Sequence, residues 1–125
     1  MTGTYTDLPG LADVYLEDSF VLEVRESVDS LTFRLDLVLT QDHPRYHDPL
    51  PGEQYCYVRG TLTFTQASKI DWIERGNAQF RDANDEVDMG NIDFFEVEEG
   101  AFHIGGDWGE VRIFSTAPPT LHIDQ

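Results

Sequence analysis

The chain has one cysteine, one lysine and no long apolar run. Because Cys56 is alone, an internal disulfide is excluded, and a reducing compartment is compatible with this composition. No apolar stretch approaches the length that a membrane-spanning helix requires. The first ten residues lack a basic region followed by an apolar run, so they do not predict a signal peptide. These absences predict a cytoplasmic protein with no membrane association.

Basic residues are scarce throughout. Eight Lys and Arg stand against 24 Asp and Glu, which gives a formal net charge of −16 at pH 7. Phosphate contacts need clustered basic side chains, so the composition argues against nucleic acid and against anionic membrane surfaces as partners. The same charge would attract a basic protein through long-range steering. Adaptation to high salt also produces an acidic, lysine-poor composition, and this alternative stays open.

A length of 125 residues predicts one domain, and 40% hydrophobic residues predict a folded core. Residues 1–10 are polar and end in Pro9 and Gly10, which is typical of a flexible lead-in. Residues 11–125 are therefore expected to form a single β domain.

Alternating apolar and polar residues are the main structural signal. Residues 31–40 place Leu or Phe at every second position, which indicates a half-buried strand. Residues 20–25 alternate in the same way, and a polar turn joins the two segments into a predicted hairpin. Residues 11–19 fit either a helical turn or a strand. Further strands are expected at residues 54–64, 69–75, 92–97, 101–104, 110–114 and 120–123. With little helix, the pattern predicts an all-β, antiparallel sandwich or barrel of about seven to nine strands.

The most acidic stretch begins at Asp82. Residues 82–111 contain ten Asp or Glu and no Lys or Arg. A calcium loop beginning at Asp85 would have Gly90 and Glu96 in place, but Val87 and Met89 occupy two ligand positions. No metal is therefore assigned to this stretch. It is interpreted instead as an electrostatic surface with apolar anchors, formed by Asp85, Glu86, Asp88, Asp93, Phe95 and Trp108. Trp108 could equally fold back into the core.

Two histidines lie in the proline-rich loop at residues 41–53. His43 and His47 are four residues apart, but Pro44 and Pro49 prevent the continuous helix that would place both on one face. A pocket near this loop, lined by both histidines and Tyr55, would suit a small-ligand-binding or metal-dependent enzyme module. No Gly-x-Ser-x-Gly motif is present and Cys56 lies on the apolar side of its strand, so no catalytic residue and no cofactor is assigned.

Tyr55, Tyr57 and Arg59 share one face of the predicted strand at residues 54–64, together with Thr61 and Thr63. Tyr and Arg dominate binding hot spots because they combine a large contact area with a polar tip. As alternatives to a binding role, another sheet or loop could cover this face, or the face could form a homodimer contact.

The charge, the size and these side chains together favour an acidic protein-binding module. The most specific form of this hypothesis is an immunity or inhibitor protein that neutralises a basic partner. The enzyme or small-ligand module and a structural or oligomerising protein are the alternatives.

Overall fold

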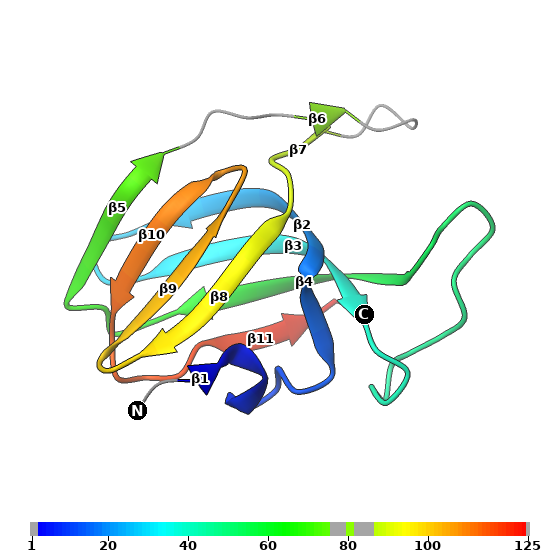
Figure 1. The fold of residues 1–125 in the computed structure, drawn as a ribbon, viewed down its shortest axis with the longest axis horizontal. Coiled ribbons are helices and arrows are strands. Elements are labelled where there is room, and N and C mark those ends of the chain that lie inside the picture. The colour runs from blue at the N-terminus through cyan, green and yellow to red at the C-terminus, as the bar shows by residue number, and fades with distance from the viewer. Residues whose placement is uncertain (1–2, 76–79, 82–86, 125) are drawn as a thin grey trace.

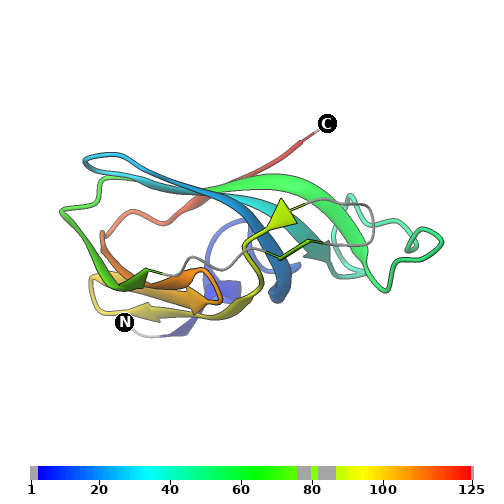
Figure 2. The ribbon, with the colours of Figure 1, turned by 90° about the horizontal axis from the view of Figure 1, so that it is seen from above.

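Two antiparallel sheets face each other in the computed structural model of the protein, which describes residues 3–75, 80–81 and 87–124 (Figures 1 and 2). The first sheet, sheet A, has the order β1-β8-β9-β10-β5: Gly3–Thr4, Ile92–Glu98, Ala101–Gly106, Gly109–Phe114 and Lys69–Arg75. Sheet B has the order β11-β4-β3-β2: Thr120–Ile123, Cys56–Phe64, Leu31–Leu39 and Val14–Glu26. The prediction of an all-β, antiparallel sandwich or barrel is confirmed, and the structure is the sandwich.

Two short elements complete the described chain. Strands β6 (Phe80–Arg81) and β7 (Val87–Asp88) form a small antiparallel ribbon, and the 3₁₀ turn η1 (Tyr5–Asp7) precedes β2. No helix in the described ranges has the length and apolar character needed to span a membrane.

The apolar residues that alternate in the sequence of β3 are the ones buried in the core. Every second residue of β3, from Leu31 to Leu39, is almost completely buried, and β3 pairs with β2 and β4 as the predicted hairpin requires. Phe33 packs edge-to-face on Phe64 with ring centroids 5.9 Å apart. Each such side chain contributes about 1.5–3 kcal/mol relative to exposure. The inward faces of both sheets therefore supply one continuous core.

Two predicted surface anchors are core residues instead. Phe95 is 4% exposed and Trp108 is 1% exposed. The indole of Trp108 lies between Phe33, at a centroid distance of 5.0 Å, and Trp72, at 6.1 Å. Neither side chain can act as a surface anchor in this fold, which corrects that part of the prediction.

The turn between β9 and β10 explains why Trp108 folds inward. A Cβ atom at Gly106 would lie 2.8 Å from the indole Nε1 and would clash with the carbonyl oxygen of Asn91. Because glycine has no side chain there, the indole and the neighbouring backbone can approach each other closely. The second of the two readings for Trp108, a core position, is therefore correct.

An irregularity in β2 determines what this strand presents to solvent. Tyr15 pairs with Val38 and Phe20 pairs with Asp36, so four residues of β2 lie opposite one residue of β3. The fully buried Ser19 bridges this bulge. Its Oγ accepts a hydrogen bond from the Val38 N–H at 3.0 Å and donates one to the Tyr15 carbonyl at 2.9 Å. The bulge allows Tyr15 and Phe20 to lie on the same outer face of sheet B.

Candidate functional site

Four aromatic side chains gather on the outer face of sheet B. Tyr15 and Phe20 come from β2 and Tyr57 from β4, while Tyr55 is the residue directly before β4. The rings of Phe20 and Tyr57 have centroids 6.0 Å apart, and those of Tyr55 and Tyr57 are 6.2 Å apart at 78°. These four residues are called the tyrosine face below.

The tyrosine face is accessible to solvent. Tyr15 is 42% exposed and the other three side chains are partly exposed. Val38 is on the outer side of the sheet and only 3% exposed, since it pairs with Tyr15 on one side and Tyr57 on the other. In Figure 2 the two sheets form separate layers, and no other described strand lies over the outside of sheet B. Cover by a second sheet, one of the sequence alternatives, is excluded for the described part of the chain.

Carboxylates surround these phenols. Asp18, inside the β2 bulge, accepts a hydrogen bond from Tyr55 and thereby raises the pKa of that phenol. Burial raises the pKa of Tyr57, and the nearby charges of Asp36 and Asp18 act in the same direction. Both hydroxyls are therefore neutral at physiological pH, and the electrostatic potential around them is negative.

Arg59 marks the border of the tyrosine face. Its Nε lies 3.6 Å from Asp36 Oδ1, and its side chain is 44% exposed. Beyond it, Arg34 forms a bidentate pair with Asp124 and donates to Thr61 Oγ1 at 3.1 Å. This second half of sheet B carries both signs of charge and a shallow groove, lined by Glu23, Arg25, Thr32, Arg34 and Thr61. The predicted strand face is thus aromatic and acidic at one end and mixed in charge at the other.

The acidic residues predicted as a surface are distributed differently. Asp93 is exposed on β8 and belongs to sheet A. The backbone of Asp88 lies in β7, while Asp85 and Glu86 lie outside the described residues. The sequence reasoning missed Tyr15, Phe20 and Asp18, because their position depends on the bulge. The signal available in the sequence was the polar run Glu17, Asp18 and Ser19 directly before the alternation that begins at Phe20.

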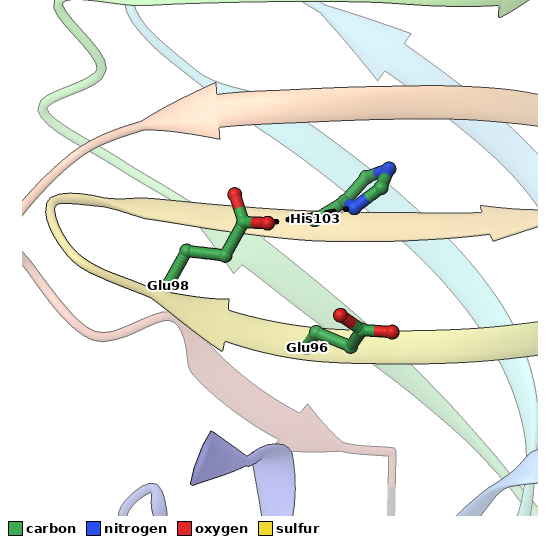
Figure 3. A group of neighbouring side chains, drawn as sticks. All are labelled: Glu96, Glu98 and His103. Carbon is green, nitrogen blue, oxygen red and sulfur yellow. Dashed lines mark ion pairs between the residues drawn. The ribbon is translucent and has the colours of Figure 1, made fainter. Parts of the chain in front are cut away.

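A second polar group lies on the outer face of sheet A. It consists of Glu96 and Glu98 on β8, His103 on β9, and Glu110 and Arg112 on β10, and is called the carboxylate–histidine cluster (Figure 3 shows the first three). His103 Nε2 lies 2.6 Å from Glu110 Oε2, and its Nδ1 lies 3.7 Å from Glu98 Oε2. His103 therefore lies between carboxylates from β8 and β10.

Arg112 connects the members of this cluster. Its Nε donates to Glu98 Oε1 at 2.8 Å, and its Nη2 lies 3.4 Å from His103 Nδ1. The ring of Phe94 packs edge-to-face on the imidazole at 4.8 Å. Strand register could have predicted the cluster, because Glu96 and His103 are direct cross-strand partners.

The histidines of the 41–53 loop make local contacts. His43 Nδ1 accepts a hydrogen bond from the Arg45 N–H at 3.0 Å, and His47 Nδ1 lies 2.8 Å from the Asp48 carbonyl oxygen. Among the described residues, the group of three potential metal ligands is Glu96, Glu98 and His103, and it includes neither loop histidine.

No protein-family model matches the chain, and neither a curated protein nor a solved structure is significantly similar to it. Inference about function therefore depends on the two outer faces of the sandwich. Sheet B carries the aromatic surface and sheet A carries the carboxylate–histidine cluster.

Proposed function

We propose that the protein is an acidic binding module that docks a basic protein partner on the tyrosine face. The observation that carries this proposal is a continuous set of partly exposed aromatic rings with carboxylates beside them. Aromatic side chains of this kind supply large contact area at low entropic cost and are enriched in binding hot spots.

The chemistry of the tyrosine face favours cationic side chains. Lys and Arg bind over aromatic rings through cation–π attraction, and Asp18 would pair with the same cations, whereas Asp36 already lies 3.6 Å from Arg59 Nε. The net charge of −16 would raise the association rate with a basic partner and disfavour an acidic one. In its most specific form, the proposal is that the module inhibits a basic toxin or nuclease by covering its active surface, as an immunity protein does.

The test compares Tyr57→Ala with Ile73→Ala. Ile73 is also an exposed apolar residue, at 48%, but it lies on β5 of sheet A. Immobilised wild-type protein and both variants are exposed to a lysate of the source cells, and a basic protein captured by the wild type is purified. We expect Ile73→Ala to bind this protein normally. Tyr57→Ala should lose about 2 kcal/mol of binding free energy, which raises the Kd roughly 30-fold.

Salt dependence provides the second measurement. The association rate of the purified partner should fall steeply as ionic strength rises, because steering between exposed charges is screened. Equal binding by wild type and Tyr57→Ala, or an association rate independent of salt, would contradict the proposal. Sedimentation of the isolated protein examines the competing explanation, since a homodimer that Tyr57→Ala dissociates would assign the face to self-association.

A further inference from the structure

We infer that the outer face of sheet A carries a Zn²⁺ site formed by Glu96, Glu98 and His103. One ligand atom from each side chain lies within 4.8 Å of the other two. Figure 3 shows the three side chains on the same side of the adjacent strands β8 and β9. This inference is independent of the tyrosine face, which belongs to the other sheet.

The imidazole of His103 is oriented for metal binding through Nδ1. Nε2 lies 2.6 Å from a carboxylate oxygen of Glu110, which as a carboxylate can only accept a hydrogen bond from it. On the other side, Arg112 can only donate to Nδ1. Both contacts therefore fit the tautomer with its proton on Nε2 and its lone pair on Nδ1, the nitrogen that lies 3.7 Å from Glu98 Oε2. A carboxylate that holds the second nitrogen of a histidine is the usual support of a zinc ligand.

The distances require little rearrangement. Zinc bonds of about 2.0–2.2 Å place neighbouring tetrahedral ligand atoms roughly 3.3–3.5 Å apart. His103 Nδ1 and Glu98 Oε2 are already 3.7 Å apart. Arg112 would give up its 3.4 Å contact with Nδ1 and retain its hydrogen bond to Glu98 Oε1, so the guanidinium would continue to orient this carboxylate.

The charge and donor types select the ion. Three carboxylates and one guanidinium leave the carboxylate–histidine cluster at −2, which a divalent cation neutralises. An imidazole nitrogen with two carboxylates suits zinc, whereas calcium and magnesium prefer sites made only of oxygen ligands. Three protein ligands would leave the fourth tetrahedral position to water.

The experiment is a calorimetric titration of the intact protein with ZnCl₂ alone. We expect one saturable site per chain. His103→Gln and Glu96→Gln should each weaken binding at least tenfold, since each removes one of three ligands. His122→Gln is the matched control because His122 is an exposed histidine on β11 of sheet B. Its affinity should equal that of the wild type.

Long-range ¹H–¹⁵N correlation spectra provide a second readout by identifying the nitrogen that binds the ion. Zinc on His103 Nδ1 supports the assignment, while zinc on Nε2 overturns it. Weak, unsaturable binding that survives both ligand substitutions would also overturn it, because it would represent diffuse attraction to surface acids. Since Glu96 is exposed, Glu96→Gln retains the fold and keeps the test decisive if His103→Gln unfolds.

Discussion

Replacing Ser19 with alanine tests whether its hydrogen bonds stabilise the β2 bulge that places Tyr15 and Phe20 on the tyrosine face. Ser19 is completely buried inside the β2 bulge, and its hydroxyl takes the place of a backbone group in the ladder to β3. Removal of this hydroxyl leaves the Val38 N–H without an acceptor and the Tyr15 carbonyl without this donor. Tyr15 is itself a member of the tyrosine face, and Val38 pairs with Tyr15 and Tyr57.

The cost follows from the loss of these two hydrogen bonds. A buried donor left unsatisfied costs about 1–3 kcal/mol, and the small apolar gain from alanine offsets little of it. We expect Ser19→Ala to lower the free energy of unfolding by about 2 kcal/mol. For a chain of this length the loss corresponds to a decrease in Tm of roughly 6–10 °C.

Urea denaturation followed by tryptophan fluorescence measures the change. The midpoint should fall with an unchanged m-value, because the substitution leaves the surface exposed on unfolding nearly the same. Ser68→Ala is the control, since Ser68 is exposed and its hydroxyl bonds to the Phe114 carbonyl at the surface. A loss below about 0.5 kcal/mol for Ser19→Ala, as expected for the control, would refute the role given to this hydroxyl.

Two further substitutions test the ends of the chain. Tyr5→Phe should lower the free energy of unfolding by about 1–2 kcal/mol, because the buried hydroxyl accepts a hydrogen bond from the Leu16 N–H and donates one to Glu17. Urea denaturation measures this change, and an unchanged midpoint would contradict it. Arg34 lowers the pKa of the Asp124 carboxyl in the folded protein. This pair therefore stabilises the fold fully at pH values above the pKa that Asp124 has in the unfolded chain, and its contribution is lost as the pH falls through the pKa of Asp124 in the folded protein. Asp124→Asn should therefore lower stability at pH 7 but not in strong acid, and an equal loss at both pH values would exclude the ion pair as the cause.

Strand positions could be predicted because alternation and burial have the same cause. A half-buried strand has one apolar side, so the period of two in β3 identified both its extent and its inward residues. The hairpin with β2 followed from the polar turn before Leu31. The predicted extent of β2 was too short, because its first half contains the bulge and does not alternate.

The candidate site could be predicted only in part because it depends on register. Tyr55 and Tyr57 were identified from a single strand, but their neighbours come from β2 through an irregularity that no period reveals. Two positions were predicted for Trp108 because the glycines around it permit either direction; only the structure, in which Gly106 leaves room for the buried indole, decides between them. The acidic run suggested one surface, whereas folding places Glu96 and Glu98 beside His103 on sheet A.

The pairing of arginines bears on the meaning of the net charge. Among the residues that the structure describes, ion pairs with acids are formed by Arg25, Arg34, Arg59, Arg75 and Arg112. Since these cations are already matched, the remaining carboxylates dominate the long-range potential. Adaptation to high salt would account for such a surface, but it gives no reason for partly exposed aromatic rings beside Asp18. A basic partner accounts for both, because one surface then provides the contact area and the charge that attracts the partner to it.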